Sequence, residues 1–202
     1  MRVTQTKAEL AFGERFARRL LKLIGWKVIL VPPPGAHSVI VFYPHTSNWD
    51  FVVGIVARAA ISLRCHFLAK DTLFRGAFGR WLRRVGGIPT NRRNSTGMIG
   101  DLAHEFAQHE EFHLVIAPEG TRRKTDHWKS GFYRLALAAR VPLGLAFIDY
   151  GRREIGIGAW LALSGDEAAD LDRIRAFYAD KRGRHPALHG TIRFVSQDTH
   201  RP

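Results

Sequence analysis

Short apolar runs alternate with stretches of helical spacing along most of the chain, and this alternation limits the possible folds more than any other feature. Apolar runs bounded by Pro, Gly or polar residues are typical of buried strands, whereas apolar residues that recur every three or four positions indicate helices. Strands are predicted over 38–43, 66–69, 112–117, 142–150, 154–157 and 191–195, and helices over 51–63, 73–85, 95–109, 130–140 and 166–181. This order predicts an α/β fold: a single domain with a mixed, largely parallel sheet flanked by helices.

The first 24 residues have the spacing of an amphipathic helix. Apolar side chains between Leu10 and Ile24 occupy one half of the helix surface, and basic side chains occupy most of the other half. Two interpretations are open: a surface helix packed on the domain, or an interfacial helix whose basic face meets anionic headgroups. The proline-rich linker 31–35 then divides the chain into an N-terminal, membrane-facing amphipathic segment, residues 1–30, and a main domain, residues 36–202.

The chain is strongly basic. Its 202 residues include 31 Lys and Arg against 18 Asp and Glu, a formal net charge of +13. This imbalance predicts a polyanionic partner: a nucleic acid, an anionic membrane or a phosphorylated substrate. Cys65 is the only cysteine, which excludes an internal disulfide and favours a reducing compartment. No apolar run reaches the ~18 residues of a membrane-spanning helix. If the protein acts on lipid, we therefore expect it to lie on the cytoplasmic face of a membrane as a peripheral protein rather than to cross it.

The turn after the predicted strand 38–43 contains His45, and Asp50 follows at the start of the next helix. Histidine titrates near neutral pH and can take a proton from an alcohol. It does so best when a carboxylate holds its other ring nitrogen. The spacing allows the loop to bring Asp50 back to His45. The alternative interpretation is that Asp50, Ser47 or Asn48 caps the helix and His45 is a turn residue.

A second polar turn, residues 118–122, follows the predicted strand 112–117. Gly120 allows a ligand to approach the backbone closely, Thr121 offers hydrogen-bond donors, and Arg122 offers a planar fork for phosphate oxygens. The alternative is an ordinary polar turn with Glu119 paired to an arginine.

A third turn, residues 86–93, contains Arg92, which is either another phosphate ligand or a solvated arginine. Taken together and in this order, the three turns resemble the glycerolipid acyltransferase family, whose best-known members make phosphatidic acid from lysophosphatidic acid. His45 and Asp50 match its His-x4-Asp block. Residues 118–122 match its Pro-Glu-Gly-Thr-Arg block residue for residue, and residues 86–92 look like its Gly-x-Ile-x-x-x-Arg block.

The resemblance implies a mechanism and a set of roles. His45 would be the general base on the acceptor hydroxyl, with Asp50 orienting it, and the oxygen would attack the thioester of acyl-CoA or acyl carrier protein directly. The family needs no metal and no bound cofactor. The phosphate and glycerol of the acceptor would be held by Arg92, Glu119, Gly120, Thr121 and Arg122.

The resemblance therefore implies an O-acyltransferase that moves a fatty acyl group to the free hydroxyl of a lysophospholipid, with 1-acylglycerol-3-phosphate as the expected acceptor and phosphatidic acid as the product. Two departures from the family leave the acceptor open. Pro44 stands where the family often has Asn. Residues 141–143 look like the start of a fourth family block, which usually continues to a second Pro, and Gly144 and Leu145 stand there instead. Another lysophospholipid or an amino-acid lyso-lipid is the alternative acceptor.

The sequence has features of two other classes of function. His109 and His113 fit the His-Glu-x-x-His pattern of zinc proteases, but that site needs both histidines on one helical face, and His113 leads directly into a predicted strand. A basic, non-enzymatic lipid- or nucleic-acid-binding protein would also explain the charge. No nucleic-acid-binding motif occurs in the sequence, so no nucleic acid is expected as a partner.

Overall fold

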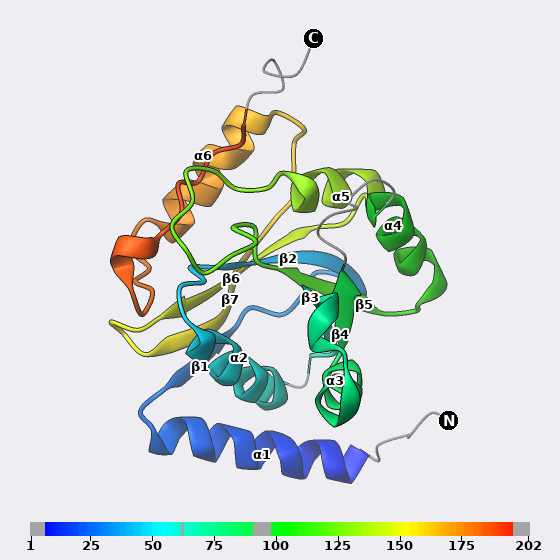
Figure 1. Ribbon diagram of the computed structural model, residues 1–202, viewed down its shortest axis with the longest axis vertical. Coiled ribbons are helices and arrows are strands. Elements are labelled where there is room, and N and C mark those ends of the chain that lie inside the picture. The colour runs from blue at the N-terminus through cyan, green and yellow to red at the C-terminus, as the bar shows by residue number, and fades with distance from the viewer. Residues whose placement is uncertain (1–6, 62, 91–97, 196–202) are drawn as a thin grey trace.

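The computed structural model describes residues 7–61, 63–90 and 98–195 (Figure 1). Within these ranges, the strands are β1 (Lys27–Leu30), β2 (His37–Tyr43), β3 (Cys65–Lys70), β4 (Gly87–Thr90), β5 (Phe112–Ile116), β6 (Leu143–Asp149) and β7 (Glu154–Leu161). The α-helices are α1 (Lys7–Leu23), α2 (Asn48–Ile61), α3 (Gly76–Arg84), α4 (Met98–Gln108), α5 (Gly131–Ala139) and α6 (Glu167–Tyr178). Two 3₁₀ turns, η1 (Asp71–Leu73) and η2 (Pro186–Leu188), complete these elements.

The strands form one sheet in the order β1-β7-β6-β2-β5-β3-β4. Every neighbouring pair is parallel except β6 and β7, which are joined by a tight antiparallel connection. The expected mixed, largely parallel sheet is therefore confirmed. β2 lies at the centre, and its continuous apolar sequence follows from burial on both faces: Val39 and Val41 point into one core, and Ile40 points into another.

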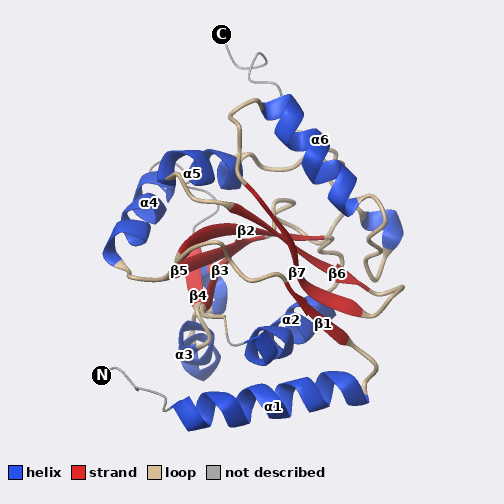
Figure 2. Ribbon diagram, turned by 180° about the vertical axis from the view of Figure 1, so that it is seen from behind, coloured by secondary structure: helices blue, strands red, loops and turns tan. Residues whose placement is uncertain are grey.

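Helices cover both faces of the sheet. Helices α1, α2 and α3 lie on one side, and α4, α5 and α6 lie on the other (Figures 1 and 2). α1 packs mainly across α2, where Ala17 and Leu21 of α1 form one apolar cluster with Val53 and Ala57 of α2. None of the helices within the described residues is long and apolar enough to cross a membrane.

The strands differ from the sequence prediction in three places. β1 falls inside the segment 1–30 and pairs with β7, so the sheet begins before residue 36. Sequence reasoning also missed β4, which is four residues long and contains Pro89. β4 is an edge strand, where the missing N–H of a proline is tolerated.

The predicted strand over 191–195 is wrong. This segment is irregular and makes isolated backbone bonds with the loop before α5: Thr191 N–H donates to Thr125 O at 3.1 Å, and Trp128 N–H donates to Arg193 O at 2.8 Å. Its apolar character instead reflects Phe194, which is buried in the core beneath α5.

Candidate active site

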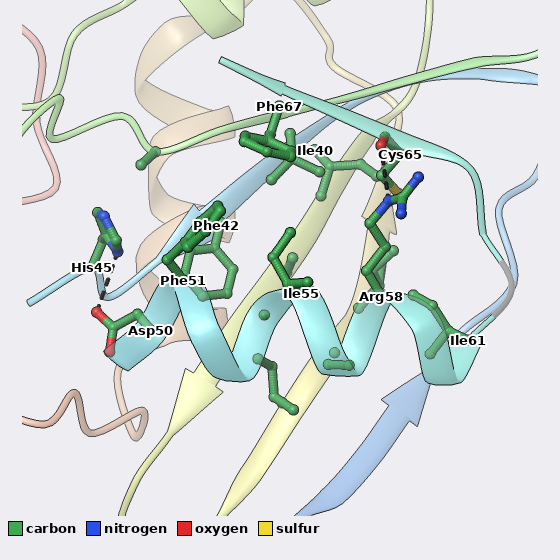
Figure 3. Close-up of a pocket in the computed structure, with 18 of the residues that line it drawn as sticks. Ile40, Phe42, His45, Asp50, Phe51, Ile55, Arg58, Ile61, Cys65 and Phe67 are labelled. Carbon is green, nitrogen blue, oxygen red and sulfur yellow. Dashed lines mark hydrogen bonds and ion pairs between the residues drawn. The ribbon is translucent and has the colours of Figure 1, made fainter. Parts of the chain in front are cut away.

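His45 lies just beyond the carboxyl end of β2, in the loop that leads to α2. Reacting groups in open α/β sheets are placed at this end of the strands. Asp50 lies in the first turn of α2 and is 1% exposed. The loop brings the two side chains together, with Nδ1 of His45 3.2 Å from Oδ2 of Asp50 (Figure 3). Because Nδ1 faces Asp50, the other ring nitrogen, Nε2, is the atom that can accept a proton from a bound hydroxyl.

Asp50 also closes the loop. Its Oδ2 accepts the backbone N–H groups of Thr46 and Ser47, each at 2.8 Å. Its Oδ1 accepts the hydroxyl of Tyr150 at 2.8 Å. The two interpretations of Asp50 are therefore compatible: the carboxylate is held at a helix N-terminus, where negative charge is favoured, and it faces the ring of His45 from that position.

Glu119 lies beneath His45 rather than at the surface. It is 3% exposed, and its Oε2 accepts the backbone N–H of His45 at 3.0 Å. Burial raises the pKa of Glu119 to about 8, opposed by the backbone N–H groups of His45 and Gly190. Among the described residues, no arginine lies within ion-pair distance of Glu119, so its pairing with an arginine is not seen there. This carboxyl group ties the second polar turn to the histidine loop.

The rest of that turn follows β5, the parallel neighbour of β2. Gly120 has a left-handed backbone with φ +64°, a conformation that favours glycine, and the side chain of Lys129 passes close to it. Thr121 is half-buried, and its hydroxyl accepts the N–H of Arg123 at 3.2 Å. Arg122 is exposed. Arg92 lies outside the described residues.

An apolar cavity of about 190 Å³ opens beside His45 and Asp50 (Figure 3). It runs between α2 and the sheet to the end of that helix, where Arg58 and Cys65 lie. Nε of Arg58 donates to the carbonyl of Cys65 at 3.0 Å, and burial lowers the pKa of Arg58. The apolar wall includes Ile40, Phe42, Phe51, Ile55, Phe67 and Val115.

Comparison with known proteins fits this arrangement. The sequence model of a family described as "Acyltransferase" matches residues 16–144, well over half of the chain. The chain belongs to the acyltransferase family. A 1-acyl-sn-glycerol-3-phosphate acyltransferase of Streptococcus pneumoniae is 29% identical over 112 residues, which are 55% of this chain and 41% of that relative. The chain thus spans less than half of that relative's length.

The fold is also found in a solved structure. The crystal structure of the 1-acyl-sn-glycerophosphate (LPA) acyltransferase PlsC from Thermotoga maritima superposes with a TM-score of 0.56 at 16% identity. The superposition covers 88% of this chain and 83% of that one. At this identity the likeness concerns the fold. It supports the α/β architecture that was predicted from the alternation of strands and helices.

The zinc-protease interpretation is wrong for this acyltransferase fold. α4 ends at Gln108, so His109 leaves the helix and His113 lies in β5. His113 is buried, with its Nδ1 2.7 Å from the hydroxyl of Ser38. The described part of the chain holds no group of three or more His, Cys, Asp or Glu side chains that could bind a metal.

The sequence did not reveal the cavity or Tyr150. The cavity wall comes from α2 and five different strands, so no local motif marks it. Tyr150 is 100 residues from Asp50 in sequence. Its position at the end of the predicted strand 142–150 was the one available signal.

Proposed function

We propose that this protein transfers a fatty acyl group from acyl-CoA or acyl carrier protein to the free hydroxyl of a lysophospholipid, with 1-acylglycerol-3-phosphate as acceptor and phosphatidic acid as product. The observation that carries the proposal is the His45–Asp50 pair at the mouth of an apolar cavity. Membership of the acyltransferase family supports the reaction class. The named function of the Streptococcus pneumoniae relative supports the acceptor.

The proposed reaction needs one base and no covalent enzyme intermediate. Nε2 of His45 takes the proton of the acceptor hydroxyl while the oxygen of that hydroxyl attacks the thioester carbonyl. The tetrahedral intermediate collapses, the carbon–sulfur bond breaks, and the imidazolium returns the proton to the departing thiolate. Asp50 keeps the neutral ring in the required tautomer and stabilises the imidazolium. Both substrates must be held together, which itself supplies part of the rate.

The cavity is the proposed site of the acyl chain. It follows α2 from Asp50 to Ile61, which is about 16 Å of helix at 1.5 Å per residue. Its wall is made mostly of aliphatic and aromatic side chains, which favour a hydrocarbon over a polar ligand. A chain lying there would have its thioester beside His45. The cavity therefore accounts for a long acyl donor as well as for the position of the base.

The acceptor phosphate is assigned to the turn after β5. Arg122 offers an exposed planar fork, and the hydroxyl of Thr121 can donate a proton. Gly120 gives the turn its left-handed backbone, and its own N–H donates to Ala117 O at 3.1 Å. Arg92 is proposed as a further phosphate ligand. Glu119 contributes by holding the backbone of His45, which positions the base relative to the acceptor.

We assign membrane association to the side of the molecule that carries α1, α2 and α3 (Figure 1). α1 exposes large apolar side chains, and Leu23 is 84% exposed. α3 exposes Phe78 and Trp81, stacked on each other, beside basic side chains of the same helix. Exposed aromatics interleaved with arginines suit an anionic membrane surface. These exposed side chains support a peripheral membrane protein that meets the lipid through α1 and α3, and we assign it to the cytoplasmic face. Of the segment 1–30, β1 is instead part of the sheet.

The test is acyl transfer from long-chain acyl-CoA and acyl carrier protein to a panel of lysolipids. His45→Ala should reduce turnover by about 10²- to 10⁴-fold, the usual contribution of a general base. His104→Ala is the matched control, because His104 is exposed on α4, on the opposite side of the sheet. Transfer to another lysolipid alone would change the acceptor, and equal activity of the two variants would contradict the role of His45.

A further inference from the structure

The two oxygens of the Asp50 carboxylate have different partners. Oδ2 faces Nδ1 of His45 and the backbone N–H groups of Thr46 and Ser47. Oδ1 accepts the hydroxyl of Tyr150, the one donor to that oxygen within the described part of the chain. The Asp50 side chain is fully buried. A buried carboxylate oxygen without a donor is costly, and the Tyr150 hydroxyl supplies the donor that the partners of Oδ2 do not give to Oδ1.

Tyr150 is itself held from several directions. It directly follows β6, and its backbone N–H donates to the carbonyl of Arg182 at 2.8 Å. Its ring packs edge-on against Trp26, with the centroids 5.1 Å apart and the planes at 87°. The guanidinium carbon of Arg184 lies 5.9 Å from the same ring. The hydroxyl thus reaches Asp50 from a fixed ring, and Tyr150 lies outside the segment 16–144 that matches the family.

We propose that Tyr150 is a positioning residue, whose hydroxyl fixes the rotation of the Asp50 carboxylate toward His45 and sets the pH at which His45 becomes a free base. A donor on Oδ1 withdraws negative charge from the carboxylate and weakens its stabilisation of the imidazolium. The charged or titratable groups facing this assembly are Asp50 itself, Glu119 at the His45 backbone, and Arg184 beside Tyr150. The inference rests on the proposed function.

The hydroxyl is suited to this role because it remains a donor. Burial, followed by the hydrogen bond and the negative charge of Asp50, raises the pKa of Tyr150 far above neutrality, opposed by Arg184. Over any ordinary assay range Tyr150 is therefore protonated and donates to Oδ1. The pH dependence of the reaction then reports on His45 and its carboxylate, not on the ionisation of Tyr150.

The test is Tyr150→Phe, which removes the hydroxyl and keeps the ring against Trp26. We expect kcat to fall about tenfold, the effect of one hydrogen bond to a charged group, with the KM of both substrates nearly unchanged. We also expect the acid limb of the kcat–pH profile to move to higher pH by ~0.5 unit, since the freed carboxylate holds the imidazolium more strongly.

Tyr133→Phe is the matched control. The Tyr133 hydroxyl donates to the buried carboxylate of Asp170 at 3.0 Å, in the layer formed by α5 and α6 on the other side of the sheet. This variant makes the same chemical change at a second buried tyrosine–aspartate pair. It should lower the melting temperature while leaving the pH profile and kcat of the wild type intact.

The outcomes separate this inference from the proposed function. If the wild type transfers acyl groups and Tyr150→Phe leaves the acid limb in place, the inference is overturned, whether or not the variant is less stable. If the wild type transfers to no acceptor, the proposed function fails. NMR titration of the His45 ring then decides the inference alone: a higher midpoint in Tyr150→Phe than in wild type and Tyr133→Phe supports it, and equal midpoints refute it.

Discussion

Replacing Glu119 by glutamine should make the free energy of unfolding less dependent on pH. Glu119 is 3% exposed, and its pKa is raised from 4.5 to about 8, mainly by burial. Between these two pH values the folded protein binds the Glu119 proton more tightly than the unfolded chain does. The contribution of this proton to the free energy of unfolding of the wild type is therefore fully present below pH 4.5 and is lost as the pH rises toward 8.

The magnitude follows from the size of this shift. One pKa unit corresponds to 1.36 kcal/mol, so a shift from 4.5 to about 8 is worth about 4 kcal/mol by pH 8. Glu119→Gln cannot ionise, and its amide oxygen can still accept the His45 N–H. At low pH, where Glu119 is protonated, the free energy of unfolding of the variant can differ from that of the wild type by an amount that does not depend on pH. Its free energy of unfolding should then rise relative to wild type by ~1 kcal/mol per pH unit between pH 5 and 8.

The assay is denaturant unfolding of both proteins at intervals from pH 5 to pH 8.5. Glu167→Gln is the control, because Glu167 is exposed in the first turn of α6 and undergoes the same loss of charge in contact with solvent. Its curve should run parallel to that of the wild type. If the Glu119→Gln curve is also parallel to it, the carboxyl group is not destabilised by burial and the reasoning fails.

Three further predictions test the cavity, the acceptor site and the membrane face. Gly54 lies on α2 and lines the cavity, and a side chain added there meets open space. Gly54→Leu should therefore leave the protein folded and reduce kcat/KM for long acyl donors more than for short ones. Equal losses for long and short donors would place the acyl chain elsewhere. Arg122→Ala should raise the KM of the acceptor about tenfold and leave the KM of the donor nearly unchanged. Arg123→Ala, at the exposed neighbouring residue, should change neither KM. A rise confined to the KM of the donor would contradict the assignment. Leu23→Ser should weaken co-sedimentation with anionic vesicles, whereas Leu137→Ser, on α5 across the sheet, should not; equal binding of both variants would exclude α1 from the membrane contact.

Sequence reasoning went furthest where the signal is local. The apolar runs of β2 and β5 are buried on both faces, so each stands out as an uninterrupted segment. His45 and Asp50 are close in sequence, and the turn between a strand and a helix brings them together. The Pro-Glu-Gly-Thr-Arg block, residues 118–122, is contiguous, so it was recognised without knowledge of the fold. These are interactions whose partners lie within a few residues of one another.

Edge strands gave weaker signals. β1 and β4 are four residues long, and each has a partner on one side only. Whether such a segment becomes a strand depends on the neighbouring edge rather than on its own sequence. The segment 191–195 shows the opposite case: it was predicted as a strand, but its apolar pattern reflects one buried side chain, Phe194, and its backbone forms no strand pairing.

The sequence by itself determined the α/β class, the His45–Asp50 pair and the family resemblance, because each depends on periodicity or on spacing within one short segment. The tertiary structure alone decided that Glu119 supports the backbone of His45, that Tyr150 holds the second oxygen of Asp50, and that α2 leaves a cavity above the sheet. These contacts join residues 74 and 100 positions apart. Their geometry is set by how the strands are ordered in the sheet, which no local pattern specifies.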